Sequence, residues 1–123
     1  MPTLSLKIAP LQNPSRYRQL AQALTKLTAV LIEDLPAARW YVSAREAERP
    51  TVMLEISITA GTNTADEKAA FIQAAFGELQ RQLGSGGRLE EASYVVVREL
   101  PASDWGYGGR TQLARKLTPV QAK

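Results

Sequence analysis

The sequence predicts an α+β fold: a tandem β-α-β repeat whose four strands form one sheet with two helices on one face. Stretches of alternating apolar and polar residues mark strands, and longer stretches with apolar residues three and four positions apart mark helices. The two halves of the chain also resemble each other. We expect a single domain over residues 1–123, with repeat one over about 2–49, repeat two over about 50–109 and a C-terminal tail over 110–123.

The first repeat is predicted to open on a strand. From Pro2 to Ile8 the even positions are apolar and the odd positions are polar, which is typical of a half-buried strand. Asn13-Pro14 then offers a cap and a first-turn proline to a helix expected from about Pro14 to Asp34. A second strand is expected from Arg39 to Glu46. The apolar stripe of the helix consists of Tyr17, Leu20, Leu24, Leu27 and Leu31.

The second repeat has the same order of elements. A strand is expected from Pro50 to Thr59, because its alternate residues are apolar. Thr64 and Glu67 form a capping box, which predicts a helix that ends near Gly84. A fourth strand is expected from Tyr94 to Leu100. The chain then carries a glycine-rich segment, Trp105-Gly106-Tyr107-Gly108-Gly109, and a basic end.

The two halves match in sequence at two places. Pro2–Ile8 resembles Pro50–Ile56 at an offset of 48, and Val42–Glu46 resembles Val95–Glu99 at an offset of 53. Matching order and spacing favour a duplication, with each β-α-β unit right-handed. The sheet face away from the helices is then either solvated or closed by other copies of the chain, and its polar and aromatic character favours closure. Its expected residues are Thr3, Ser5, Lys7, Tyr41, Ser43, Arg45, Glu55, Ser57, Tyr94 and Arg98.

Composition excludes several classes of function. With no Cys and no His, the chain has no Cys nucleophile, Ser-His pair or disulfide, and a zinc or copper site is not expected. Net charge is +3, but the basic residues are scattered among acids, so nucleic-acid binding is disfavoured. There is no apolar run of about 20 residues for a membrane span and no signal-peptide pattern. We therefore expect a cytoplasmic protein that needs no cofactor or metal.

The amino terminus is a candidate reactive group. Initiator methionine is usually removed before a residue as small as proline, which would leave Pro2 with a free secondary amine. A strand fixes that amine in space, whereas a frayed terminus would not. An α-amino group titrates near ~7.7–8.0, and desolvation or nearby cations lower the pKa of an amine. Such a shift would leave a neutral base at working pH.

Together, the terminal proline, the repeated β-α-β unit and the segment Trp105–Gly109 resemble the tautomerase superfamily, and within it 4-oxalocrotonate tautomerase. Residues 95–109 fit that family's strand, acidic-hydrophobic link and aromatic-Gly-x-Gly-Gly motif in order and length. Short members are single β-α-β units that form hexamers. The resemblance therefore implies a fused, two-repeat form with the fold shared by macrophage migration inhibitory factor, assembled as a homotrimer.

The resemblance also implies site residues. Pro2 matches the family's general base, and Trp105 matches the aromatic residue that lines the proline pocket. Tyr94 aligns with a substrate-binding arginine of 4-oxalocrotonate tautomerase and with a pocket tyrosine of the cytokine branch. Strand packing at a subunit contact is the alternative role for Trp105 and Tyr94. Gln12 and Thr62-Asn63 stand where the family's other arginine would be.

With both arginines missing, another cation is needed for a carboxylate. Arg39 shares the predicted strand face of Tyr41 and is the candidate, with Arg16, Arg18 and Arg110 as weaker ones. The main hypothesis is a proline-dependent tautomerase or isomerase of a small 2-oxo or enol acid. The alternatives are a non-catalytic homotrimeric binding protein with this fold, or a dehalogenase, hydratase or decarboxylase of the same superfamily.

Overall fold

One mixed sheet of four strands forms the centre of the molecule. The computed structural model describes residues 2–24, 29–84 and 87–117. Its strand order is β2-β1-β5-β6, made of β1 (Thr3–Ala9), β2 (Ala29–Asp34), β5 (Thr51–Thr59) and β6 (Tyr94–Leu100). The central strands β1 and β5 are antiparallel, and each pairs in parallel with the second strand of its own half. The predicted α+β class is therefore confirmed.

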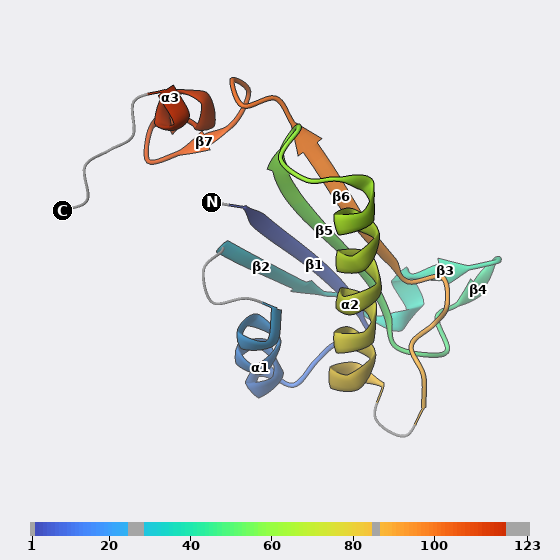
Figure 1. Cartoon of the computed structure of the whole chain (residues 1–123). Coiled ribbons are helices and arrows are strands. Elements are labelled where there is room, and N and C mark those ends of the chain that lie inside the picture. The colour runs from blue at the N-terminus through green and yellow to red at the C-terminus, as the bar shows by residue number, and fades with distance from the viewer. Residues whose placement is uncertain (1, 25–28, 85–86, 118–123) are drawn as a thin grey trace.

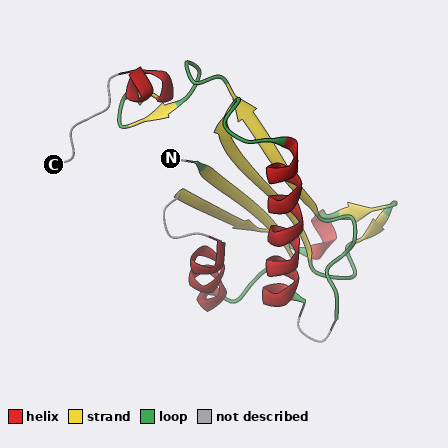
Figure 2. Ribbon diagram, in the orientation of Figure 1, coloured by secondary structure: helices red, strands yellow, loops and turns green. Residues whose placement is uncertain are grey.

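Both main helices cover the same face of the sheet (Figures 1 and 2). They are α1 (Pro14–Leu24) and α2 (Ala65–Leu83), and α2 begins with the predicted capping box at Thr64 and Glu67. None of the helices in the described residues is long and apolar enough to cross a membrane.

The core lies between this sheet face and the helices. Leu6 and Leu54 are paired across the two central strands, and both side chains are fully buried. Burial of one such side chain contributes about 1.5–3 kcal/mol, so this pair anchors the centre of the sheet. The other buried members of the cluster are Leu4, Ile8, Leu20, Val52, Ala75, Leu79, Leu83 and Leu89.

The predicted helix over Pro14–Asp34 is wrong in its second half. The described part of α1 ends at Leu24, and Ala29–Asp34 form β2 beside β1. Leu31 fits the leucine spacing of the helix by chance, but it lies on the outer face of the sheet with 67% of its surface exposed. Its neighbours Val30 and Ile32 pack against the core instead. Leu27, also assigned to the helix, lies outside the described residues.

The predicted strand over Arg39–Glu46 is also wrong. This segment forms a short 3-10 helix, η1 (Ala37–Arg39), and a hairpin of β3 (Tyr41–Val42) and β4 (Arg45–Glu46). Ser43 and Ala44 make the turn with φ of 51° and 66°, so the reversal carries no Gly or Asn to signal it. Tyr41, Ser43 and Arg45 therefore do not belong to the open face of the main sheet.

The glycine-rich segment forms the matching hairpin of the second half. It consists of β7 (Gly106–Tyr107) and β8 (Arg110–Thr111), and α3 (Gln112–Leu117) follows where only a basic end was expected. The two hairpins lie at opposite ends of the sheet, and β7–β8 is at the end where β1 starts (Figure 1).

The hairpins correct the internal alignment. The predicted match of Val42–Glu46 with Val95–Glu99 is wrong, because the first segment is a hairpin and the second a strand. Instead, Leu35-Pro36-Ala37 corresponds to Leu100-Pro101-Ala102 at an offset of 65, and Trp40 corresponds to Trp105. The backbone bonds agree: Ala47 N donates to Trp40 O, and Gln112 N donates to Trp105 O, each at 2.8 Å.

Candidate functional site

Pro2 lies in the wall of a cavity of about 190 Å³. Because β1 runs antiparallel to β5, with Thr3 opposite Ser57, the start of β1 lies beside the end of β5. The remaining walls come from the second half of the chain. They are Ile58 and Thr59 of β5, Thr62 and Asn63 of the turn before α2, and Trp105 and Gln112 on either side of the glycine-rich hairpin.

Close packing of the hairpin holds Trp105 in place. A Cβ atom on Gly106 would lie 1.9 Å from the carbonyl oxygen of Arg110, so only glycine fits there. On the other side of the hairpin, Leu113 N donates to Ala102 O at 2.9 Å. The indole nitrogen of Trp105 is shielded from solvent and has no hydrogen-bond partner among the described residues. Such a donor is costly to leave unpaired, so an acceptor that reached it would be bound favourably.

The turn that carries Thr62 and Asn63 is held by hydrogen bonds. Thr62 Oγ1 donates to Thr59 O at 2.7 Å, and Asn63 Nδ2 donates to Glu67 Oε1 at 3.4 Å. Thr64 N also donates to the Glu67 carboxylate, at 2.8 Å. This backbone bond is the main reason that the pKa of Glu67 is lowered, so the carboxylate that braces the turn stays ionised.

None of the charged side chains that the structure describes lines this cavity. Its walls offer two threonine hydroxyls, the amides of Asn63 and Gln112, and the indole of Trp105. Within residues 2–24, 29–84 and 87–117 there is also no cluster of carboxylates suited to a metal ion. The arrangement can therefore orient a small polar molecule by neutral hydrogen bonds beside the start of β1.

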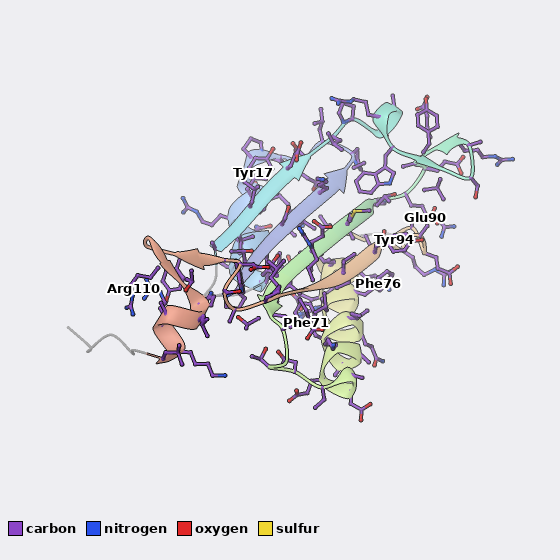
Figure 3. All side chains as sticks on the ribbon, turned by 90° about the horizontal axis from the view of Figure 1, so that it is seen from above. Tyr17, Phe71, Phe76, Glu90, Tyr94 and Arg110 are labelled. Carbon is purple, nitrogen blue, oxygen red and sulfur yellow. The ribbon has the colours of Figure 1, made fainter. Side chains whose placement is uncertain are left out.

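Tyr94 and Arg39 lie far from Pro2 within one chain. Tyr94 starts β6 opposite Met53, four residues along β5 from the Ser57 that faces Thr3, or about 13 Å along the sheet. Arg39 ends η1, which follows β2 at that same far end. Both side chains are exposed. Figure 3 shows Tyr94 at the opposite end of the sheet from Arg110 of the glycine-rich hairpin.

Two of the weaker arginine candidates have structural partners. Arg16 Nη1 donates to Gln82 O at 2.6 Å, near the C-terminal end of α2. Arg110 Nη2 donates to Ala114 O at 3.2 Å and so ties the hairpin to α3. Arg18 is exposed on α1. None of the three lines the Pro2 cavity.

Sequence reasoning missed Gln112, Thr59 and Ile58 as cavity residues. The correct repeat alignment is a signal for Gln112. It places Gln112 directly after the hairpin β7–β8, just as Ala47 directly follows the hairpin β3–β4. Thr59 and Ile58 reach the cavity only through the antiparallel register of β1 and β5. That register is a tertiary feature without a local signal.

The sequence matches no protein family profile, and no curated protein is similar enough to be matched. Solved structures are similar. The wild-type symmetric trimer of Q0 fused 4-OT has a TM-score of 0.75 and 22% identity, over 91% of this chain and 97% of that chain. Pt0534 inactivated by 2-oxo-3-pentynoate has a TM-score of 0.74 and 17% identity, over 91% and 97%. N1, of the cis-3-chloroacrylic acid dehalogenase family, has a TM-score of 0.73 and 24% identity, over 89% and 82%.

The chain has the fold of the tautomerase superfamily. These likenesses extend over almost the whole chain. At such identities they establish the fold, and activity must be argued from the residues of this chain.

Proposed function

We propose that the protein is a tautomerase in which the amine of Pro2, freed by removal of Met1, is the general base for a small 2-oxo or enol acid. The observation that carries this proposal is the cavity at the start of β1, which Pro2 shares with Trp105. A general base must reach the proton that it moves, and a residue fixed at the start of a central strand meets that requirement.

The proposed reaction moves one proton between oxygen and carbon. The Pro2 nitrogen takes the proton of the enol hydroxyl as the carbonyl forms at C2, and it then delivers a proton to C3. Thr62, Asn63 and Gln112 would orient the carboxylate by neutral hydrogen bonds, and the unpaired indole N–H of Trp105 is a further donor. The walls therefore suit one carboxylate better than two.

Assembly of copies is part of the proposal. Tyr94 and Arg39 lie at the end of the sheet away from Pro2, so they would join a Pro2 site only from a neighbouring copy. A homotrimer is consistent with the similar fused 4-OT, which forms a symmetric trimer. The open sheet face also exposes Leu31 and Tyr94, which association would cover. Light scattering at micromolar concentration tests this, and a stable monomer would contradict it.

The decisive experiment blocks the terminal amine. Intact mass first establishes whether Met1 is absent, and ketonisation of phenylenolpyruvate is then followed by ultraviolet absorbance. In a variant that keeps one extra residue before Pro2, the Pro2 nitrogen is an amide and not an amine. The kcat/KM of this variant should be at least about 100-fold lower than that of the protein with a free Pro2. Pro50→Ala, at the corresponding strand of the other half, is the control. Unchanged turnover with the amine blocked would favour a non-catalytic binding protein, or a base elsewhere. A halogenated acrylate serves as a second substrate for the dehalogenase alternative.

Substrate choice gives a second test. We expect phenylenolpyruvate to be ketonised faster than a dienol dicarboxylate at equal concentration, because the described walls of the Pro2 cavity hold no cationic side chain for a second carboxylate. A dicarboxylate preference that Arg39→Ala abolishes would show instead that Arg39 of a neighbouring copy supplies that cation.

A further inference from the structure

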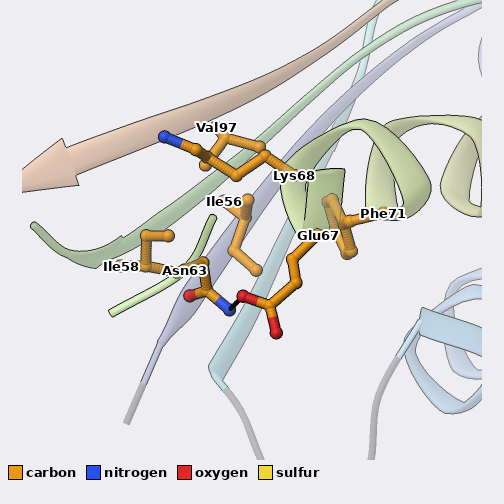
Figure 4. Close-up of a pocket in the computed structure, with 7 residues that line it drawn as sticks. All are labelled: Ile56, Ile58, Asn63, Glu67, Lys68, Phe71 and Val97. Carbon is orange, nitrogen blue, oxygen red and sulfur yellow. Dashed lines mark hydrogen bonds between the residues drawn. The ribbon is translucent and has the colours of Figure 1, made fainter. Parts of the chain in front are cut away.

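A second, apolar pocket lies next to the Pro2 cavity, under the first turns of α2 (Figure 4). Its volume is about 110 Å³. Its apolar walls are Ile56 and Ile58 of β5, Val97 of β6 and Phe71 of α2, and its polar rim is Asn63, Glu67 and Lys68. The Pro2 site as described above makes no use of this pocket.

The two spaces share the side chains of Ile58 and Asn63, which line both. Asn63 is the polar member of this pair, and two solvent-exposed hydrogen bonds hold its amide. Its Nδ2 donates to Glu67 Oε1 at 3.4 Å, and its Oδ1 accepts from Thr62 Oγ1 at 3.1 Å. The first bond is long, and the second uses a hydroxyl that also donates to Thr59 O at 2.7 Å, so both are weak. Rotation of the Asn63 side chain exchanges these bonds for bonds to water and would join the apolar pocket to the Pro2 cavity.

The charges at the rim decide which chemical group suits the pocket. Lys68 is already paired with Glu99 at 3.1 Å, and Glu67 is ionised as the cap of α2. These three side chains sum to one negative charge, so a second carboxylate of a substrate would be repelled. A hydrocarbon group meets the isoleucines, the valine and the phenylalanine without such a cost.

From these observations we propose that the side chain of a 2-oxo or enol acid passes Asn63 into this pocket while its carboxylate and C2–C3 atoms stay beside Pro2. The substrate class is then 2-oxo acids with an uncharged hydrocarbon side chain. An apolar cavity of about 150 Å³ holds benzene, so this smaller pocket takes a chain of roughly three or four carbons. The inference rests on the proposed function and adds substrate selection to it.

A chain-length series tests the inference. Exchange of the C3 protons with D₂O, followed by NMR, reports enolisation of pyruvate, 2-oxobutanoate, 2-oxopentanoate and 2-oxohexanoate. We expect kcat/KM to rise roughly fourfold for each added methylene until the pocket is full. 2-Oxoglutarate, which ends in a second carboxylate, should be slower than 2-oxopentanoate. A flat profile, or a preference for 2-oxoglutarate, overturns the inference.

Variants locate the effect. Val97→Phe fills the pocket and should remove the advantage of 2-oxohexanoate while leaving pyruvate within twofold. Phe71→Leu enlarges it and should shift the optimum to a longer chain. Phe76→Leu is the matched control, because Phe76 lies on the same helix, is also partly buried and lines neither space. Equal effects of the two Phe→Leu changes contradict the proposal.

The inference and the proposed function fail in different ways. If blocking the Pro2 amine leaves all exchange rates unchanged, the proposed function fails. If exchange depends on that amine but Val97→Phe does not alter the length profile, only the pocket is wrong. Binding without turnover gives an independent readout. In the wild type, added hexanoate should shift the NMR signals of the Ile58 and Val97 methyl groups. In Val97→Phe, where Ile58 alone can be followed, its signal should not shift. If hexanoate causes no shift in the wild type, the proposed pocket is wrong.

Discussion

The two halves of the chain are built alike, but their hairpins differ in the residues that form them. In the first half, Ser43 and Ala44 adopt positive φ without glycine. In the second half, Gly108 and Gly109 take the same places, and Gly106 replaces the exposed Tyr41. Glycine lets the second hairpin pack closely, because no Cβ fits at Gly106. The tighter hairpin is the one beside Pro2.

The strands that the hairpins accompany differ as well. Pro2 opens β1, and Pro50 opens β5 at the opposite end of the sheet. The nitrogen of Pro50 belongs to a peptide bond and cannot act as a base. The same architecture therefore stands at both ends of the sheet, and under the proposed removal of Met1 a terminal amine is available at one end alone.

Each half also has a carboxylate near the end of its second strand, at equivalent positions, but the two carboxylates accept hydrogen bonds from different kinds of donor. Asp34 ends β2 and accepts a hydrogen bond of 2.7 Å from the Tyr17 hydroxyl. Its counterpart Glu99 accepts from Lys68 at 3.1 Å, and Tyr17 and Lys68 both lie four residues after the helix-start residues Asn13 and Thr64. The same contact between strand and helix is thus present in both halves. It is a hydrogen bond from a neutral hydroxyl in the first half and an ion pair in the second.

The largest expected difference between the halves concerns the two tryptophans. Trp105→Leu should lower kcat/KM for enol ketonisation about 10- to 100-fold, because it removes a wall of the Pro2 cavity and its unpaired donor. Trp40→Leu, at the equivalent place far from Pro2, should leave kcat/KM within twofold. Thermal unfolding of both variants separates loss of structure from loss of function. Equal loss of activity in the two variants would contradict a site at Trp105.

A smaller effect is expected at the hairpin turns, where Ala44 and Gly109 are equivalent. Gly109 has a φ of +80° and open space around its Cα, so Gly109→Ala tests backbone conformation alone. We expect it to lower the free energy of unfolding by about 1–2 kcal/mol. The reciprocal Ala44→Gly relieves a φ of 66° but adds freedom to the unfolded chain, and should stabilise by about 0.5–1 kcal/mol. Urea unfolding measures both, and the same sign for the two changes would refute this account.

Much of the fold could be predicted from local patterns. Strand alternation gave β1, β5 and β6, and the capping box placed the start of α2, since each signal lies within a few residues. β2 was missed because Leu31 extends the leucine spacing of α1, and only pairing with β1 makes that segment a strand. The first hairpin was missed because Ser43 and Ala44 give no turn signal.

The candidate site was predictable in part. Pro2 and Trp105 were identified together through the family resemblance, and they line one cavity. The resemblance also implies Tyr94 for this site, and Arg39 is the candidate cation, but within one chain both lie at the other end of the sheet. Side chains that meet through strand register or between copies leave no trace in the local sequence.

The smallest expected effect is on the pH dependence of Tm, and it distinguishes Asp34 from Glu67, the two carboxylates that accept hydrogen bonds near the helix starts. Hydrogen bonds from Gln12 N and the Tyr17 hydroxyl lower the pKa of Asp34, and the bond from Thr64 N lowers that of Glu67. A carboxylate with a lowered pKa stabilises the fold above its ordinary pKa, and this is lost as pH falls through the lowered value. Asp34→Asn and Glu67→Gln should therefore each flatten the fall of Tm below about pH 5.

The dependence of Tm on pH in the alkaline range distinguishes Asp34→Asn from Glu67→Gln. The hydrogen bond to Asp34 raises the pKa of Tyr17 above its usual 10.0. A raised pKa in the folded state gives stability that is present below the ordinary value and lost as pH rises through the raised one. Asp34→Asn and Tyr17→Phe should therefore also flatten the fall of Tm above about pH 10, whereas Glu67→Gln should not. Glu33→Gln is the control, because Glu33 lies beside Asp34 on β2 and its carboxylate accepts no hydrogen bond from any described residue. If Glu67→Gln altered the alkaline limb as much as Asp34→Asn, the Tyr17–Asp34 bond would not be its cause.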